Sequence, residues 1–147
     1  MSSTDLTQAT EASSGAVSYN AAVEFVDSNV ARGRGAKAAF IDPTRTLTYA
    51  ELKERTDRFA NALPRLGIGR ERRIVLIMLD TVDFPPVFWG AIKAGVLPVP
   101  INTLMTAEQW RFVIRDSRAD AIVVSSELLP QFAPLNWCAS DAGLPPP

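Results

Sequence analysis

Two acidic side chains stand at the position in this sequence where α/β proteins often bind ligands. Asp80 and Asp83 directly follow the apolar run 73–79, which has the Ile, Val, Leu and Met content of a buried parallel strand. Carboxylates just beyond the carboxyl end of such a strand could take part in a ligand site. The same acids would also stabilise the N-terminus of the next helix through its dipole. We favour helix capping for both, and we interpret Lys93 as a charge at the end of that helix.

Other residues that commonly carry chemistry are missing or badly placed. Histidine is absent from the 147 residues, which excludes Ser-His-Asp and Cys-His catalysis and histidine-based zinc sites within the chain. The only cysteine, Cys138, cannot form an internal disulfide and has no neighbouring His or Lys to activate it. The segment Gly67-Ile68-Gly69 precedes a strand, so it indicates a helix stop rather than a phosphate-binding loop. We therefore assign no catalytic, cofactor-binding or metal-ligating residue.

The charge pattern does not indicate a nucleic acid or a membrane as a partner. The chain has 15 Lys and Arg against 16 Asp and Glu. Residues 32–73 hold a local excess of bases, but aromatic side chains are not interleaved with them, and several bases are spaced for pairing along a helix. Trp89 and Trp110 lie on apolar helix faces, which predicts core positions. The longest apolar run, 74–79, is far shorter than the about 20 residues of a membrane-spanning helix.

Three segments of the chain differ in composition. Residues 1–17 are rich in Ser, Thr and Ala and lack the basic start and apolar run of a signal peptide, so we expect a disordered, uncleaved leader and a cytoplasmic protein. Residues 18–134 carry the predicted helices and strands, and the apolar content of 47% is sufficient for a core. The pattern decays after Pro130, and residues 135–147 are predicted to form an irregular tail.

Two helix starts carry the spacing of a capping box. Thr48 with Glu51, and Thr106 with Gln109, are three residues apart, so each side chain can bond to the other's backbone N–H. The first of these helices should begin at residue 49. Pro64 interrupts its pattern, and a proline in a helix interior costs roughly 3 kcal/mol. We therefore expect a kink or an early end near residue 63.

The order of the elements predicts an α/β fold with an incomplete doubly wound parallel sheet flanked by helices. Strands that alternate with helices over short loops must run parallel, with right-handed crossovers. Pro98 and Pro100 cannot donate ladder hydrogen bonds, so their strand is short, irregular or at an edge. No further strand closes the sheet, and its open edge could support self-association. The predicted sheet strands are 73–79, 96–101 and 121–124, and an upstream hairpin joins 38–41 to 46–48.

Several segments carry a resemblance to a known family. MLDTVDFP at 78–85, GAIKAG at 90–95 and PVPINTL at 98–104 resemble benzoate-CoA ligases, which are AMP-forming aryl acid:CoA ligases. LTYAEL at 47–52 is similar to the first shared motif of the wider acyl-adenylate-forming superfamily, and 91–103 is similar to the second. The chain therefore resembles the N-terminal part of the large AMP-binding domain of such a ligase.

The resemblance implies a reaction for the complete enzyme. Such ligases join benzoate or a related aryl acid to ATP, release pyrophosphate with the help of magnesium, and then transfer the acyl group to CoA with release of AMP. The family binds the phosphates with a Ser/Thr/Gly-rich loop ending in Pro-Lys-Gly, and this sequence contains no such loop. We therefore expect this segment to hold no ATP, magnesium or CoA. Pro64 and the stretch after Leu135 depart from the family pattern, which suggests a frameshift, a premature stop or a degraded gene.

Two hypotheses of different classes remain for the chain. The first is an N-terminal fragment of a benzoate-CoA ligase-like enzyme that is inactive by itself. The second is a stand-alone, non-catalytic α/β module for interaction or nucleotide binding, which associates through its exposed sheet edge. Cooperative unfolding of a defined oligomer favours the second, whereas an aggregating or molten product with exposed apolar surface favours the first.

Overall fold

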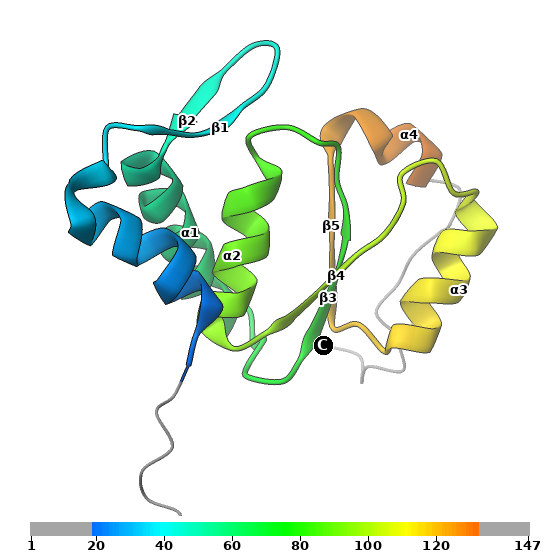
Figure 1. Cartoon of the computed structure of the whole chain (residues 1–147). Helices are drawn as coiled ribbons and strands as arrows, with labels where there is room; N and C mark the ends of the chain where they lie inside the picture. Colours follow the sequence, from blue (N-terminus) through cyan, green and yellow to red (C-terminus); the bar gives the residue numbers. More distant parts are fainter. Residues whose placement is uncertain (1–18, 133–147) are drawn as a thin grey trace, which may run out of the picture.

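The computed structural model describes residues 19–132 as a small sheet with helices on both faces and a hairpin beside it (Figure 1). The described chain begins with a helical segment that contains two π-helical stretches, η1 and η2. No helix in residues 19–132 is long and apolar enough to cross a membrane. In chain order the elements are η1 (Val23–Asp27), η2 (Val30–Arg34), β1 (Ala38–Ile41), β2 (Thr46–Thr48), α1 (Tyr49–Arg65), β3 (Arg73–Ile77), α2 (Phe84–Ala94), β4 (Leu97–Pro100), α3 (Ala107–Ser117), β5 (Ala121–Val124), η3 (Ser126–Leu128) and α4 (Leu129–Phe132).

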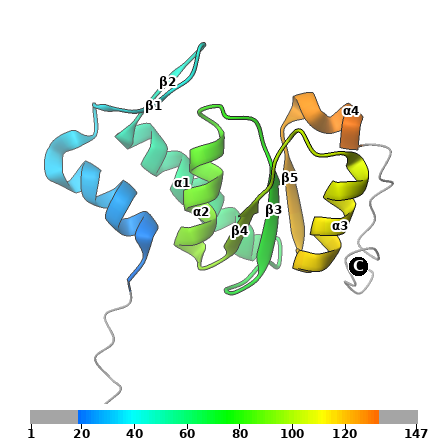
Figure 2. The ribbon, with the colours of Figure 1, turned by 45° about the vertical axis from the view of Figure 1, so that its right-hand side comes forward.

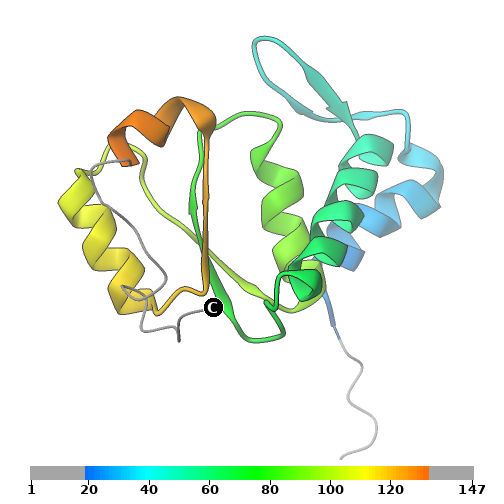
Figure 3. The same ribbon diagram turned by 180° about the vertical axis from the view of Figure 1, so that it is seen from behind.

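Three parallel strands in the order β4-β3-β5 form the sheet. Figure 2 shows α2, with α1 beyond it, on one face and α3 on the other. In the view from behind (Figure 3), the antiparallel β1–β2 hairpin projects above α1, far from α3. The central strand β3 is buried on both faces, which explains its continuous apolar run. These features confirm the predicted doubly wound α/β fold and the predicted hairpin.

Each face of the sheet has its own apolar core. Val75 and Ile77 pack with Trp110 beneath α3, whereas Ile74 and Leu76 pack beneath α1 and α2. Trp110 is fully buried, and it is the largest side chain in the described core. A third cluster lies under the hairpin and the N-terminal helical segment, and half-buried Trp89 packs against it. Its buried members are Val26, Leu47, Leu52 and Val82.

Both capping boxes form, as the sequence predicted. Thr48 N–H donates to Glu51 Oε2 at 2.8 Å, and Glu51 N–H donates to Thr48 Oγ1 at 3.3 Å. Thr106 N–H donates to Gln109 Oε1 at 2.9 Å, and Gln109 N–H donates to Thr106 Oγ1 at 3.3 Å. Each box satisfies two N–H groups that have no partner inside the helix, so α1 and α3 begin at residues 49 and 107.

The predicted kink or early end of α1 near residue 63 is wrong. The helix continues through Pro64 to Arg65, so only its last turn contains the proline. A Schellman motif closes that turn: Ile68 N–H donates to the Leu63 carbonyl at 3.0 Å, and Gly67 N–H donates to the Pro64 carbonyl at 3.1 Å. Leu63 and Ile68 also pack in the same core cluster. These bonds and this apolar contact offset the hydrogen bond that the proline cannot make.

We expect Gly67→Ala to lower the free energy of unfolding by about 1 kcal/mol, because Gly67 has a left-handed φ of 76°. Gly69→Ala is the matched control. A Cβ at either glycine would meet nothing within 4 Å, but only Gly67 has positive φ. Chemical denaturation of both variants measures the difference, and equal effects of the two substitutions would contradict the helix stop.

Candidate functional site

The carboxyl edge of the sheet is the candidate site, because the chain leaves β3 and β4 toward opposite faces. β3 leads into α2, which packs on one face, and β4 leads into α3, which packs on the other. In open α/β sheets, ligands bind in the crevice outside the carboxyl ends of strands at such a switch point. The loops 78–83 and 101–106 border this position, and Ser125 follows the end of β5.

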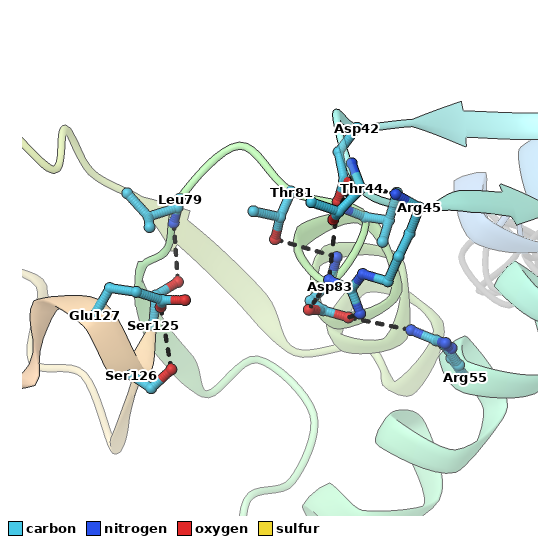
Figure 4. Close-up of polar contacts among 11 residues, drawn as sticks. Asp42, Thr44, Arg45, Arg55, Leu79, Thr81, Asp83, Ser125, Ser126 and Glu127 are labelled. Atoms are coloured by element: carbon cyan, nitrogen blue, oxygen red, sulfur yellow. Dashed lines mark hydrogen bonds and ion pairs between the residues drawn. The ribbon is translucent and has the colours of Figure 1, made fainter.

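Hydrogen bonds from neighbouring elements position these loops. Leu79 N–H donates to Ser125 Oγ at 3.0 Å, which ties the end of β3 to the end of β5 (Figure 4). The indole N–H of Trp110 donates to the Asn102 carbonyl at 3.0 Å. Asn102 Oδ1 in turn accepts the Leu104 N–H at 2.8 Å. The backbone at this edge is therefore held by an adjacent strand and by α3.

Asp83 is the N-cap residue of α2, as the predicted helix capping requires, but its side chain does not cap the helix. The side chain makes no capping hydrogen bond. Its carboxylate instead accepts hydrogen bonds from Arg45 at 2.6 Å and from Arg55 at 3.1 Å (Figure 4). These contacts join the hairpin, α1 and the β3–α2 loop. Asp83 therefore links these three elements, since both arginines are ion-paired to its carboxylate.

Asp42 is the second link between the hairpin and this edge. One oxygen of its carboxylate accepts the N–H groups of Thr44 at 2.8 Å and Arg45 at 2.7 Å, and the other accepts the Val82 N–H at 3.1 Å. The N–H of Val82, followed by the N–H and hydroxyl of Thr44, holds the pKa of Asp42 well below its usual range. The bonds of Asp42 to Thr44 and Arg45 are local to the turn, whereas its bond to Val82 joins residues 40 positions apart and became visible only in the fold.

Asp42→Ala should make the free energy of unfolding less sensitive to a fall in pH. The depressed pKa means that the Asp42 carboxylate stabilises the fold above its ordinary pKa of 3.8, and that this contribution falls as the pH drops toward the folded-state pKa. We expect the unsubstituted chain to lose more unfolding free energy between pH 6 and about pH 3 than the variant does. Denaturant titrations at both pH values test this. Asp42→Asn is the control that keeps the size of the side chain, and parallel losses in all three proteins would contradict the prediction.

Asp80 also fails to cap α2, since it lies before the N-cap residue Asp83. It is exposed, and its carboxylate makes no hydrogen bond or ion pair with the residues that the structure describes. It borders a hollow of about 190 Å³ beside Phe40, Ile41 and Phe84. Ligand pockets usually enclose about 300–1,000 Å³, so this hollow is smaller than a typical binding site.

Lys93 does more than place a charge at the end of α2. Its ammonium group donates to both carboxylate oxygens of Asp27, at 2.7 and 2.6 Å, and to Asp57 of α1. Lys53 donates to the other oxygen of Asp57. The Lys93 and Asp27 side chains are only 20% and 23% exposed. This half-buried cluster connects the N-terminal helical segment, α1 and α2, away from the candidate site.

Other bases of residues 32–73 are also paired with acids. Arg58 lies 3.9 Å from Glu54 on α1, and Arg72 lies 3.1 Å from Asp120 across the sheet. Both arginines are largely exposed. Such pairs are typical of a solvated face and contribute little to stability.

Acidic side chains in the described residues are not gathered as a metal ion would need. Within residues 19–132, no three His, Cys, Asp or Glu side chains gather so that they could hold a metal. The segment 67–69 joins α1 to β3, so it lies at the amino edge of the sheet, opposite the candidate site. The N–H of Gly67 is already used in the helix stop.

Sequence comparison links the chain to a family. The model of the AMP-binding enzyme family matches residues 27–142. The chain is 56% identical over 112 residues to a 4-hydroxybenzoate-CoA/benzoate-CoA ligase of Rhodopseudomonas palustris, a match that covers 76% of the chain and 21% of that ligase. It is 45% identical over 118 residues to a benzoate-CoA ligase of Thauera aromatica, which covers 80% of the chain and 22% of the relative. The chain thus spans about a fifth of these relatives.

Structural comparison agrees with the sequence. A crystal structure of a benzoate-CoA ligase from Burkholderia xenovorans superposes with a TM-score of 0.75 at 42% identity, over 80% of this chain and 24% of that one. An anthranilate-CoA ligase in complex with anthranoyl-AMP superposes with the same TM-score at 30% identity, over 80% of this chain and 22% of that one. The family match covers most of the residues that form the sheet, its flanking helices and the candidate site. The chain therefore belongs to the AMP-binding enzyme family, with benzoate-CoA ligases among its relatives.

Proposed function

We propose that this chain forms the N-terminal sheet layer of an AMP-forming ligase that converts benzoate, or a ring-hydroxylated benzoate, into its CoA thioester. The observation that carries the proposal is the 56% identity to a 4-hydroxybenzoate-CoA/benzoate-CoA ligase over 112 residues. A long-chain-fatty-acid-CoA ligase of Mycobacterium tuberculosis is only 33% identical over 94 residues. This difference favours an aryl acid over a fatty acid as the substrate class.

The proposed role of the chain is structural. The full reaction consumes ATP, an aryl carboxylate and CoA and yields the aryl-CoA thioester, AMP and pyrophosphate, with magnesium as the expected metal. The 147-residue sequence contains no Ser/Thr/Gly-rich loop ending in Pro-Lys-Gly, which supports assigning the chemistry to other parts of the ligase. The chain's own contribution is the packed sheet and the bonded loops at its carboxyl edge. We place the activity in the cytoplasm, where ATP and CoA are supplied.

A chimera tests the proposal. The 112-residue segment of the Rhodopseudomonas palustris ligase would be replaced by the segment of this chain that aligns with it. We expect the chimera to form AMP in a reaction that depends on benzoate and CoA, with a kcat/KM within about tenfold of that of the parent ligase. A sheet layer that fits well should raise the activation free energy by no more than about 1.4 kcal/mol. The equivalent chimera with the Thauera aromatica segment is the positive control.

Two outcomes would count against the proposal. The first is a chimera that unfolds cooperatively but forms no AMP with benzoate while the Thauera chimera does. The second is benzoate-dependent release of pyrophosphate by the purified 147-residue chain alone, since that chain would then need a triphosphate site. A stable, defined oligomer of the 147-residue chain together with an inactive chimera would favour the non-catalytic interaction module.

A further inference from the structure

Four aromatic side chains from four different elements meet around a hollow beside the hairpin. They are Phe25 of η1, Phe40 of β1, Tyr49 of α1 and Trp89 of α2. The buried side chain of Leu52 also lines the hollow, which has a volume of about 310 Å³. This volume lies at the lower end of the range of about 300–1,000 Å³ that ligand pockets usually have. The hollow is therefore large enough for a small ligand.

Two of these rings are exposed although they are apolar. The side chains of Phe25 and Phe40 belong to residues that are 55% and 39% exposed. The centroids of the Phe25 and Trp89 rings lie 5.8 Å apart, and the ring planes are tilted by 37°. Phe88 contacts the Trp89 ring edge to face at a centroid distance of 5.3 Å, which fixes the orientation of the indole. A further flat ring in the hollow would remove these exposed rings from water, so the lining favours an aromatic ligand.

The charges around the hollow favour an anion. Asn29 lines the hollow, and its Oδ1 accepts a hydrogen bond from Arg34 Nη1 at 3.0 Å. Arg34 makes no ion pair with the described residues, whereas Arg32 on the same segment is paired with Glu24 at 3.2 Å. Among residues 19–132, no acidic side chain lines the hollow. An unmatched guanidinium group beside an aromatic hollow suits a carboxylate, because the two groups form charge-assisted hydrogen bonds.

The smaller hollow at the carboxyl edge of the sheet has the opposite charge character. Phe40 borders both hollows. Two acidic side chains, Asp42 and Asp80, line the smaller one, which has a volume of only about 190 Å³. Like charges repel, so an aromatic anion should occupy the larger hollow near Arg34 and avoid the smaller one.

We propose that the larger hollow binds an aromatic carboxylate, with the ring against Phe25, Phe40 and Trp89 and the carboxylate group near Arg34. All the groups that would hold the ligand belong to residues 25–89. The inference therefore does not rest on the proposed function, since it needs no residue from another part of the ligase. Benzoate has both a flat ring and a carboxylate, so it is the probe that tests the site.

Titration of the isotope-labelled 147-residue chain with benzoate, followed by NMR of the indole N–H groups, is the experiment. The Trp89 signal should move and saturate with a Kd on the order of 1 mM, as expected for so small a ligand. The Trp110 indole donates to the Asn102 carbonyl and packs on the other face of the sheet, so its signal is the internal reference and should stay in place. Cyclohexanecarboxylate has the same charge but no flat aromatic ring, and it should bind about fivefold more weakly. A Trp89 signal that does not move at about ten times the expected Kd overturns the inference.

Arg34→Gln and Arg32→Gln form a matched pair of variants, because each removes one positive charge from an exposed position of η2. Arg34→Gln should weaken the binding of benzoate at least about fivefold, whereas Arg32→Gln should leave it nearly unchanged. Benzamide keeps the ring but has no charge, so it should bind to both variants equally. Equal affinities of the two variants for benzoate contradict the inference. Movement of the Trp89 signal with the concentration of the chain alone also contradicts it, since a second copy would then cover the hollow.

Discussion

Gly90→Ala is expected to lower the free energy of unfolding by about 1–3 kcal/mol, although alanine is normally the better helix residue by about 1 kcal/mol. A Cβ at Gly90 would lie 2.9 Å from the carbonyl oxygen of Thr56 and 2.9 Å from Cδ1 of Phe59. The Phe59 ring can shift, but the Thr56 carbonyl belongs to the backbone of α1. To relieve the clash with the Thr56 carbonyl, α1 and α2 must move apart. The contact between these two helices is the most extensive helix–helix contact in the described chain.

The measurement is chemical denaturation followed by far-UV circular dichroism. Gly69→Ala is a suitable control, because a Cβ at Gly69 meets nothing within 4 Å and its φ is not positive. Gly90→Val should be more damaging than Gly90→Ala, since a branched side chain places further atoms against α1. If Gly90→Ala proves as stable as the unsubstituted chain, α1 and α2 cannot pack as closely as the structure has them.

Lys93→Met is expected to destabilise the fold at neutral pH by about 2 kcal/mol, because two half-buried carboxylates lose their shared cation. The side chains of Asp27 and Asp57 are 23% and 31% exposed, so water compensates for part of the loss. Lys53→Met is the matched control. Among the described residues, Lys53 is ion-paired only with Asp57 and is 36% exposed, so its removal should cost no more than about 0.5 kcal/mol. Equal losses of unfolding free energy in Lys93→Met and Lys53→Met would contradict the ion cluster.

The pH dependence of the Lys93 variant provides an independent check. Burial lowers the pKa of Lys93, but its hydrogen bonds to Asp27 and Asp57 outweigh burial, so the pKa is raised above its ordinary 10.5. Burial raises the pKa of Asp57, but the bonds from Lys53 and Lys93 outweigh it, so the pKa falls below its ordinary 3.8.

The signs of these two shifts define a pH window. The raised Lys93 pKa adds stability below pH 10.5 that is lost at higher pH, and the depressed Asp57 pKa adds stability above pH 3.8 that is lost in acid. The stability difference between the unsubstituted chain and Lys93→Met should therefore be largest between these values and shrink as the Asp57 carboxylate becomes protonated. Denaturation across this pH range measures it, and a constant difference down to pH 2 would be inconsistent with the ion cluster.

Much of the fold follows from short-range patterns. The capping boxes at Thr48 and Thr106, the helix stop at Gly67 and the apolar run of β3 each act within a few residues, and all are found as predicted. Pro64 was misjudged because the penalty for a helix interior does not apply in a last turn that a Schellman motif closes. The open edge of the sheet was predicted from the sequence. Which side of β4 Pro98 and Pro100 face could be decided only from the register of β4 with β3.

The candidate site was less accessible to prediction. Its place at the carboxyl edge follows from the order of strands and helices, but the roles of its acidic residues do not. Asp83 was expected to cap α2, yet its carboxylate forms ion pairs with two arginines that lie 38 and 28 residues earlier in the chain. A guanidinium ion pair competes well with a capping bond once packing brings the charges together. Nothing in the local spacing around Asp83 encodes that approach.

The sequence by itself determined most of the secondary structure, the parallel α/β class and the absence of histidine chemistry, because these depend on neighbouring residues and on composition. It also carried the family resemblance. Only the tertiary structure decided that Lys93 joins Asp27 and Asp57, that Asp42 reaches Val82, and that Gly90 must lack a side chain. These contacts join residues far apart in the chain. Their geometry depends on how closely helices pack and how loops end, which no local pattern of residue types specifies.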